Sequence, residues 1–392
     1  MSDTLINSFT VAYHYPVCWG HNIFKGRDRT LETFLSDPAF ELRPTPVLVF
    51  MDAGFAAAWP EMAQDIVAWG ETHPELISLR IEPQVLPGGE ACKNGLAVPQ
   101  KVIATVQKAR LCRHSQIWVI GGGAFLDAVG LGAALFHRGI PLLRFPTTSL
   151  AQCDSGVGVK NGCNLKGIKN LVGVFAPPIG VMNDPTFLVT LPQRDWLSGI
   201  AEAFKVAIIQ DLDFLQWLAN HASELRERNF AAMEILLKRC AALHVQHIQK
   251  GGDPFELGSA RPLDFGHWSA HKLESLSHFS IKHGEAVSIG IALDLHYAAA
   301  IKLISKQDAQ FCCQALQNCG LPICHPLLQK KNRQGKLQLL DGLDEFREHL
   351  GGTLHLTLPA PLGQKIEVSE MNTQILIQSL QNEAWAKPEN GR

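Results

Sequence analysis

The residues of this 392-residue chain that most suggest chemistry are a carboxylate, a lysine and several histidines in its second half. Glu202 and Lys205 are three positions apart in GIAEAFKVAII, so on a helix they share one face. The apolar flanks of this run predict that both side chains are buried. His267 and His271 are four positions apart and share a helix face in the same way, and His283 lies further along the chain.

These side chains predict a metal site. Burying charges that have no function is costly, which favours a role for the Glu202–Lys205 pair. Glu202, His267 and His283 could supply three ligands to a zinc ion and leave a fourth position for substrate oxygens, as catalytic zinc sites do. The alternatives are an exposed ion pair and histidines that bind no metal.

Glycines at the end of an apolar run predict a nucleotide site. Gly121–Gly123 follow QIWVI and precede a helical pattern, so the backbone could approach a pyrophosphate at a helix N-terminus. The G-x-G-x-x-G pattern is incomplete, because Leu126 occupies its third glycine position, and a simple tight turn is the alternative. The run PGGEACKN adds Glu90 and Lys93. Asp52 ends VLVFMD, where it could bind a ribose hydroxyl or be no more than a strand-end carboxylate.

A basic segment follows Asp154 in the sequence. It is rich in glycine and carries Lys160, Lys166, Lys169 and Asn170. The lysines lie among glycines and apolar residues rather than along a helix stripe, which predicts a loop that forms an anion pocket. A solvated charged surface is the alternative. Arg138 is expected at the end of a helix, where it could also be an ordinary surface or capping residue.

The elements that would position these residues alternate between strands and helices in the first half. Strands are expected at 47–52, 76–83, 116–123 and 141–148, and helices at 60–75, 94–111 and 124–135. This alternation predicts an α/β, Rossmann-like domain with a parallel sheet, residues 1–190. Helical periodicity then dominates at 195–211, 212–228 and 231–250 and around His267 and His283, with two short strands in 353–369. We therefore expect a mainly α-helical second domain, residues 191–392.

The bulk composition excludes several classes of protein. With 46% hydrophobic residues, 18% charged residues and a net charge of −2, the chain lacks the basic footprint of a nucleic-acid-binding protein. Its ten cysteines form no Cys-x-x-Cys pairs, so reduced thiols are expected, with a metal cluster at Cys312, Cys313, Cys319 and Cys324 as the alternative. No signal peptide and no apolar run of membrane-spanning length is found, which favours the cytoplasm and no membrane partner.

Taken together, the motifs resemble those of the 3-dehydroquinate synthase family, the sugar phosphate cyclases. They read PGGE-x-x-K, GGG-x-x-x-D, PTT-x-L-A-Q-x-D-S, A-E-x-x-K, GH-x-x-x-H and HGEAV. The resemblance implies an NAD cofactor that ends each turnover unchanged, a divalent metal (zinc, or cobalt) and a small sugar phosphate as substrate. It also implies a homodimer in which Arg138 reaches the substrate phosphate of the neighbouring subunit.

The resemblance also implies roles for individual residues. The metal ligands are Glu202, His267 and His283. Substrate-binding and catalytic positions are matched by Asp154, Lys160, Lys169, Asn170, Lys205, His271 and Arg138. Positions that contact NAD are matched by Asp52, Glu90, Lys93, Gly122, Gly123, Asp127, Thr147 and Thr148.

Departures from the family pattern bear on the substrate. Asp264 replaces the asparagine of R-x-x-L-N-x-GH, and Arg261 is one residue out of register. His244 aligns with a lysine of the preceding helix, and Arg347 and Glu348 align with a terminal Lys-Lys pair. An added acid and lost cations disfavour a carboxylated substrate. The alternative is that His244, Arg261 and Arg347 replace the missing cations.

The departures and the ending GL-x-E-F-R-x-x-LGG resemble the cyclases of sedoheptulose 7-phosphate, although those often lack the histidine found here at His271. The chain is therefore expected to be a divergent branch, with Asp264 in its catalytic site. True 3-dehydroquinate synthesis is one alternative. A glycerol-1-phosphate or polyol dehydrogenase is another, although such enzymes usually carry Asp at the Glu202 position. A silent NAD-binding scaffold is disfavoured by the retained ligands.

Overall fold

The structure is a computed structural model that describes residues 4–40, 42–251, 254, 255, 262–349, 352 and 354–381. The chain divides into two compact units. The first comprises Met1–Phe145 and Val159–Asp184, and the second comprises Pro146–Gly158 and Pro185–Arg392. A short segment from the first half of the sequence, Pro146–Gly158, therefore belongs to the second unit.

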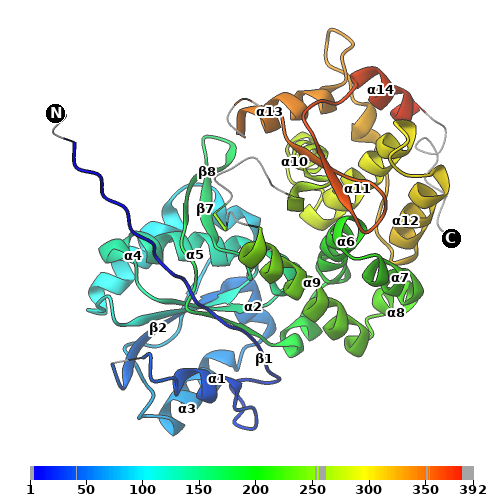
Figure 1. Ribbon diagram of the computed structural model, residues 1–392. Helices are drawn as coiled ribbons and strands as arrows, with labels where there is room; N and C mark the ends of the chain where they lie inside the picture. The colour runs from blue at the N-terminus through cyan, green and yellow to red at the C-terminus, as the bar shows by residue number, and fades with distance from the viewer. Residues whose placement is uncertain are drawn as a thin grey trace. The chain divides into compact units, whose positions relative to one another are not determined.

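A seven-stranded sheet organises the first unit (Figure 1). Its strands, in spatial order, are β1 (Val17–Trp19), β9 (Gly180–Asn183), β6 (Leu142–Pro146), β5 (Gln116–Gly121), β2 (Thr45–Asp52) and β3 (Ile77–Leu79), with β4 (Gln84–Leu86) also paired to β2. The pairings of β2 with β3, β4 and β5 and of β9 with β1 and β6 are parallel. Every residue of β2 and β5 is buried, which is why these strands are continuous apolar runs in the sequence.

Helices lie on both sides of this sheet (Figure 1). They are α1 (Thr30–Leu35), α2 (Ala53–Ala58), α3 (Met62–Thr72), α4 (Ala97–Lys108) and α5 (Gly123–Leu135), with short helical turns η1 (Glu90–Lys93) and η2 (Phe136–Arg138). Helix α5 is rich in small residues because its neighbours approach closely. A Cβ atom on Gly130 would lie 1.9 Å from Oδ1 of Asn161. The expected parallel α/β domain is confirmed.

The basic segment after Asp154 is a hairpin rather than the expected loop. Strands β7 (Lys160–Leu165) and β8 (Ile168–Phe175) pair antiparallel, with Leu165 opposite Ile168. The two connecting residues, Lys166 and Gly167, both have positive φ, 53° and 77°. This backbone suits the right-handed twist of a two-residue hairpin. Lysine is an uncommon residue at such a turn, which is why the sequence pattern did not indicate it.

The second unit is mainly helical, as expected. It contains α6 (Gln193–Gln210), α7 (Leu212–Asn220), α8 (Ala222–Arg226), α9 (Phe230–Lys250), α10 (His267–Leu276), α11 (His283–Ala300), α12 (Lys306–Asn318), α13 (Asp341–His349) and α14 (Thr373–Gln381). Shorter helical turns are η3 (Ala151–Ser155), η4 (Pro185–Thr190), η5 (Pro262–Asp264), η6 (Pro326–Gln329) and η7 (Gln338–Leu340).

Two expectations for this unit have different outcomes. The single helix expected at 212–228 is wrong, because the chain breaks at His221 into α7 and α8. The two strands expected near the C-terminus form the antiparallel pair β10 (Leu356–Pro359) and β11 (Lys365–Val368).

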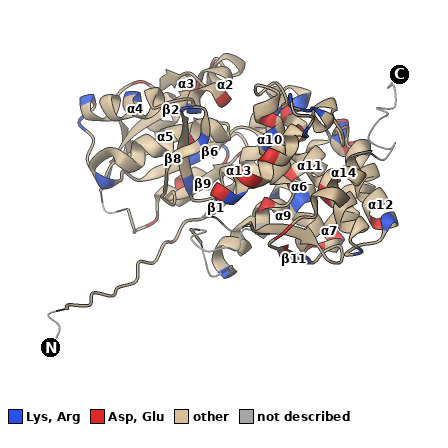
Figure 2. Ribbon diagram, turned by 90° about the horizontal axis from the view of Figure 1, so that it is seen from above, with Lys and Arg blue, Asp and Glu red and all other residues tan. Residues whose placement is uncertain are grey.

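Charged residues of both signs are interspersed in each unit (Figure 2). None of the ten cysteines forms a disulfide, and no group of three possible metal ligands in the described part of the chain includes a cysteine. Among the residues whose structure is described, no helix combines the length and the apolar character needed to cross a membrane.

Candidate metal and nucleotide sites

Helix α6 carries a buried ion pair at its centre. The side chains of Glu202 and Lys205 are 0% and 2% exposed, which confirms the burial expected from their apolar flanks. Nζ of Lys205 lies 2.5 Å from Oε2 of Glu202 and 3.7 Å from Oδ1 of Asp154, a residue of η3. One lysine therefore sits between two carboxylates that come from distant parts of the sequence.

Two imidazoles face the other oxygen of Glu202. Its Oε1 atom lies 3.3 Å from Nε2 of His283 and 3.8 Å from Nε2 of His267. Ligand atoms held at roughly 2.0–2.2 Å around a tetrahedral zinc ion are roughly 3.3–3.6 Å apart. The distance to His283 fits such an ion, and the distance to His267 is slightly longer. Oε1 is also buried and lacks a well-aligned hydrogen-bond donor among the described residues. The three side chains therefore form a donor set that could hold a metal ion, with a buried carboxylate oxygen at its centre.

Close backbone packing brings these ligands together from three helices. Gly284, the second residue of α11, lies against α6 so closely that a Cβ on it would be 2.4 Å from Cα of Ser198. Gly266, directly before α10, has a φ of 77°, and a Cβ there would be 2.8 Å from the backbone nitrogen of Ile291. Glycine at these two positions lets α11 start against α6 and lets α10 start against the middle of α11. His267 and His283 are the first residues of α10 and α11.

The start of α10 is also held by a buried carboxylate. Oδ2 of Asp294 accepts the backbone N–H of Gly266 at 3.0 Å, and its Oδ1 accepts the indole N–H of Trp268 at 2.9 Å. Nδ1 of His267 lies 3.0 Å from the carbonyl oxygen of Phe265. A proton on Nδ1 would be donated to that carbonyl, which leaves the Nε2 lone pair of His267 directed toward Glu202.

Asp154 connects this cluster to α9. Its Oδ1 atom lies 2.9 Å from Nδ1 of His244, the residue that aligns with the family's lysine. A Cβ on Gly158 would lie 3.3 Å from Nε2 of the same ring. His244, Asp154, Lys205 and Glu202 therefore form a continuous row of contacts within the second unit.

The charges in this row set one another's pKa values. Burial disfavours the ionised form of Asp154, but the charge of Lys205 and the hydrogen bond from His244 outweigh it and hold the pKa of Asp154 well below its usual range. Burial likewise opposes ionisation of Glu202, yet Lys205 lowers its pKa. Burial works against the charged form of Lys205, and the two carboxylates overcome it and raise its pKa. A negative, a positive and a second negative group therefore alternate at neutral pH.

The two imidazoles respond in opposite directions. Burial and the nearby charge of Lys205 lower the pKa of His267. Burial also opposes the charged form of His283, but Glu274 and Glu202 outweigh it and raise the pKa of His283 to about 10. A metal ion that binds Nε2 of His283 must therefore displace a proton.

Asp264 and His271 lie beside the donor set. Asp264 is half-buried in η5, three residues before His267, and its charge acts on the His267 ring. The ring centre of His271 is 5.5 Å from that of His267 and 6.2 Å from that of His283.

Two arginines are candidate replacements for the family's missing cations. Arg347 donates a hydrogen bond to Oδ1 of Asp344 at 2.7 Å within α13. Arg261 lies outside the described residues.

A second group of expected site residues meets in the first unit. Nζ of Lys93 donates to Oδ2 of Asp127 at 2.7 Å and to Oδ1 of Asn170 at 2.8 Å. Lys93 is buried, and although burial disfavours its charge, Asp127 raises its pKa. A residue of η1, one of α5 and one of the β7–β8 hairpin are thus held together by one ammonium group.

Asp52 links the carboxyl end of β2 to the loop that follows β4. Its Oδ1 accepts the backbone N–H groups of Gly54 and Phe55 and so caps α2, while Oδ2 accepts the N–H of Gly89 at 3.3 Å. Gly122 and Gly123 are the N-cap and first residue of α5 at the neighbouring strand end. Ligands of open parallel sheets bind outside the carboxyl ends of the strands, so these residues lie where a dinucleotide would be expected.

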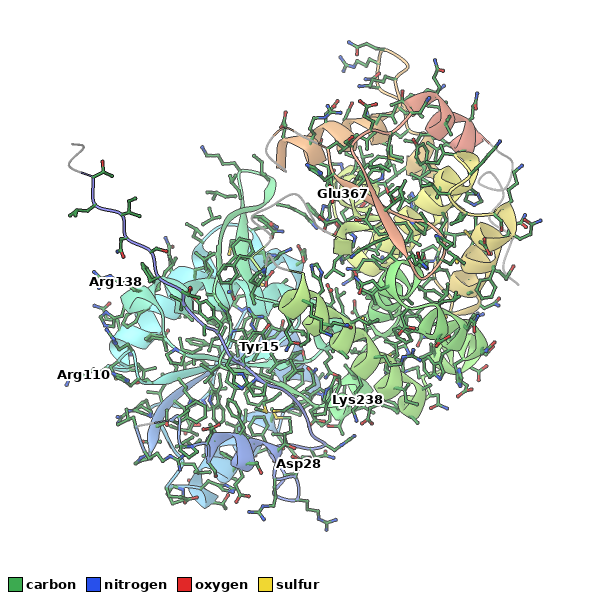
Figure 3. All side chains as sticks on the ribbon, viewed as in Figure 1. Tyr15, Asp28, Arg110, Arg138, Lys238 and Glu367 are labelled. Atoms are coloured by element: carbon green, nitrogen blue, oxygen red, sulfur yellow. The ribbon has the colours of Figure 1, made fainter. Side chains whose placement is uncertain are left out.

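The remaining expected site residues are divided between the two units and differ in burial. Glu90, Lys160 and Arg138 are exposed and Lys169 is half-buried, all in the first unit. Figure 3 shows Arg138 at the periphery of that unit. Thr147 and Thr148 belong to the second unit, where Thr147 is buried and Oγ1 of Thr148 accepts the N–H of Ala151 at 3.1 Å. The structure therefore assembles two groups, one in each unit.

One residue at the site was missed by sequence reasoning. Glu274 is buried on α10, and its Oε2 lies 3.4 Å from Nδ1 of His283. The signal was available in the run HWSAHKLE, because Glu274 is seven residues after His267 and three after His271, on the same helix face.

Comparison with known proteins identifies the family. The protein combines a parallel α/β unit with a helical unit whose carboxylate and imidazole groups could hold a metal ion. The family model for the 3-dehydroquinate synthase N-terminal domain matches residues 83–198, and that for its C-terminal domain matches residues 199–340. The chain therefore belongs to the 3-dehydroquinate synthase family.

Relatives in sequence carry the same family name. The 3-dehydroquinate synthase of Pseudomonas savastanoi pv. phaseolicola (strain 1448A / Race 6) is 33% identical over 310 residues, which are 77% of this chain and 80% of the relative. That of Dichelobacter nodosus (strain VCS1703A) is 35% identical over 276 residues, 67% of this chain and 74% of the relative.

Solved structures share the fold. The 2-epi-5-epi-valiolone synthase of Streptomyces hygroscopicus subsp. jinggangensis 5008, with NAD+ and Zn2+ bound, has a TM-score of 0.85 at 24% identity and covers 98% of this chain and 100% of its own. A 2-deoxy-scyllo-inosose synthase complexed with carbaglucose-6-phosphate, NAD+ and Co2+ has a TM-score of 0.75 at 21% identity, with 93% and 95% covered.

Proposed function

We propose that this protein is an NAD- and metal-dependent sugar phosphate cyclase that eliminates phosphate and closes a carbocycle. The observation that supports this most directly is the donor set of Glu202, His267 and His283 beside the buried Lys205. We assign NAD binding to residues 1–190 and metal binding to residues 191–392. Zinc is the preferred ion, because catalytic zinc sites combine imidazole and carboxylate ligands in this number. Cobalt is the alternative, because the same ligands also suit it.

When bound, the metal would polarise a substrate hydroxyl and NAD would accept and return the hydride of that carbon. The chain's own residues prepare the site for this chemistry. Lys205 keeps Glu202 and Asp154 ionised although they are buried or half-buried. Oδ1 of Asp154 contacts both His244 and Lys205, which fixes the carboxylate as an acceptor for a substrate hydroxyl.

Phosphate binding is assigned to cationic and amide side chains that the family motifs match. They are Lys160, Lys169, Asn170, His271 and, from the neighbouring subunit of a homodimer, Arg138. The contact between Lys93 and Asn170 supports a common function for the nucleotide and hairpin residues. An oriented cluster of donors around the departing phosphate lowers the barrier to its elimination.

The favoured substrate is a non-carboxylated sugar phosphate such as sedoheptulose 7-phosphate. The support is Asp264, a carboxylate three residues before His267, and His244, which is engaged by Asp154 where the family carries a lysine. The negative charge of Asp264 disfavours a substrate carboxylate. The replacement of the family's lysine by His244, whose ring is already held by Asp154, disfavours it as well. The similarity in fold to a 2-epi-5-epi-valiolone synthase and to a 2-deoxy-scyllo-inosose synthase agrees with this choice.

Synthesis of 3-dehydroquinate itself is the second candidate. The relatives with 33–35% identity are named 3-dehydroquinate synthases, and His271 is retained beside the donor set. A glycerol-1-phosphate or polyol dehydrogenase is less favoured, because such enzymes usually carry Asp at the Glu202 position and lack the set of Lys160, Lys169 and Asn170.

The deciding experiment uses a panel of substrates. Protein loaded with zinc and NAD is incubated separately with heptulose, heptulosonate and hexose phosphates and with polyols. Phosphate release, product mass and NADH absorbance are then measured. Phosphate and a carbocycle from a heptulose phosphate, without NADH accumulation, are expected. Turnover of the heptulosonate phosphate alone would establish the second candidate, and steady NADH formation from a polyol would replace both with a dehydrogenase.

A further inference from the structure

Two sets of possible metal ligands share one imidazole. Glu202, His267 and His283 form the first set, and His271, Glu274 and His283 form the second. In each set the ligand atoms lie within 4.8 Å of one another. Because His283 has only two ring nitrogens, the role of each set depends on which nitrogen Glu202 and Glu274 each contact.

The two nitrogens of His283 face different acids. Nε2 lies 3.3 Å from Oε1 of Glu202, and Nδ1 lies 3.4 Å from Oε2 of Glu274. Both carboxylates are almost completely buried, with side chains 0% and 4% exposed. The His283 ring is therefore placed between a carboxylate of α6 and one of α10.

The other imidazole ligand is arranged in the same way. His267 directs Nε2 toward Glu202 and Nδ1 toward the carbonyl oxygen of Phe265 at 3.0 Å. In both rings one nitrogen thus faces the shared carboxylate of the first set, and the other faces an oxygen acceptor. An acceptor at Nδ1 fixes the tautomer in which Nε2 carries the lone pair that binds a metal.

We propose that Glu274 is a positioning residue of the metal site: its carboxylate accepts the Nδ1 proton of His283 and directs Nε2 of that ring to the metal held with Glu202 and His267. This inference rests on the proposed function, because it requires that the first donor set binds a metal. It makes the second donor set a support of the first rather than a separate metal site.

The test compares metal affinity between variants in the absence of NAD and substrate. Glu274→Gln keeps an acceptor without its charge, and Glu274→Leu removes the acceptor while keeping most of the volume. The control is Glu285→Gln, which removes a carboxylate two residues from His283 whose oxygens bond Arg194 and the N–H of Lys282. The dissociation constant for zinc is measured by competition with a chelator, and circular dichroism checks folding.

Loss of an outer partner of a metal-bound histidine weakens metal binding by roughly 10–100-fold. We expect a loss of this size for Glu274→Leu, a smaller one for Glu274→Gln, and a change of less than about threefold for Glu285→Gln. A packing role alone would leave zinc binding by both Glu274 variants at the wild-type level, and that result would overturn the inference. Wild-type protein that binds no zinc would overturn the proposed function as well.

A second measurement decides the matter if the Glu274 variants do not fold. Nitrogen-15 NMR of the zinc-loaded wild-type protein, with His283 assigned by comparison with His283→Gln, reports which ring nitrogen carries the proton. Zinc on Nε2 and a proton on Nδ1 are expected. Zinc on Nδ1 would instead make Glu274 a ligand of the second donor set and contradict its positioning role.

Discussion

Glu202 is the residue on which the metal site depends most directly, because its Oε1 atom faces both imidazoles and its Oε2 atom faces Lys205. We expect Glu202→Gln to lose zinc and cyclase activity together. The amide keeps the shape of the side chain but removes the negative charge that a divalent cation requires. Zinc content by plasma emission spectrometry and phosphate release are the two measurements.

The matched control for this variant is Glu345→Gln, which neutralises a carboxylate that bonds Lys272 at the surface. It should keep one zinc per chain and wild-type activity. Stoichiometric zinc in Glu202→Gln would remove Glu202 from the ligand set, whatever happened to the activity.

Asp264 is the residue to which we assign selection against a substrate carboxylate. Asp264→Asn removes a negative charge close to His267 and restores the amide that is usual in the family. Relief of one like-charge contact should raise kcat/KM for a heptulosonate phosphate relative to a heptulose phosphate by roughly tenfold or more. The ratio of the two kcat/KM values, measured on the same preparation, is the readout. An unchanged ratio would show that Asp264 does not take part in specificity.

At the scale of elements, Asp294 fastens α10 to α11 through Gly266 and Trp268. Burial outweighs the two hydrogen bonds it accepts and raises the pKa of Asp294 from 3.8 to about 7. Between those pH values the native state keeps a proton that the unfolded state releases. The stabilisation from this group is therefore complete below about pH 4 and is lost as the pH rises to about 7.

Asp294→Asn removes this dependence of stability on pH. Because an amide has only one acceptor oxygen, the variant also loses one of the two hydrogen bonds that Asp294 accepts. We expect the variant to be less stable than wild type by roughly 1–3 kcal/mol at pH 4, the usual penalty for a buried donor left without its partner. The difference in unfolding free energy should shrink as the pH rises toward 7. Urea titrations of both proteins at several pH values measure it. A difference that grows with pH would contradict the assignment of a raised pKa to Asp294.

Elements with strong local signals were predictable, whereas those that depend on distant contacts were not. The apolar runs of β2 and β5 indicated buried parallel strands, and the spacing of Glu202 and Lys205 indicated one helix face. The β7–β8 hairpin was missed because its turn, Lys166 and Gly167, lacks the usual residue types.

The internal geometry of the site also exceeded what the sequence could indicate. The orientation of the His283 ring depends on the close crossing of α6 and α11 at Ser198 and Gly284, a tertiary contact that no local pattern contains. For the same reason the sequence did not reveal that Pro146–Gly158, with Asp154, belongs to the second unit.

At the scale of the whole molecule, each unit supplies part of the proposed chemistry. The first unit holds the strand-end glycines and the cluster around Lys93, and the second holds the donor set. Arg138 fits neither cluster. It follows α5 with a φ of 66°, it is exposed, and no hydrogen bond or ion pair holds its guanidinium among the described residues. An arginine in this state is available to a second copy of the chain.

If Arg138 acts in the neighbouring subunit, two inactive variants should complement each other. Arg138→Ala and Glu202→Gln subunits, co-expressed in equal amounts with different tags, form mixed dimers in which one of the two sites has both residues intact. Random pairing makes half of the dimers mixed, so about a quarter of the wild-type activity should return. Purification through both tags should raise this to about half, because every remaining dimer then holds one complete site.

The control is co-expression of Glu202→Gln with His283→Ala. These two variants alter the same donor set, so their mixed dimers should have no activity. Absence of activity in the Arg138→Ala and Glu202→Gln mixture, in a preparation shown to be dimeric, would place Arg138 with the site of its own subunit.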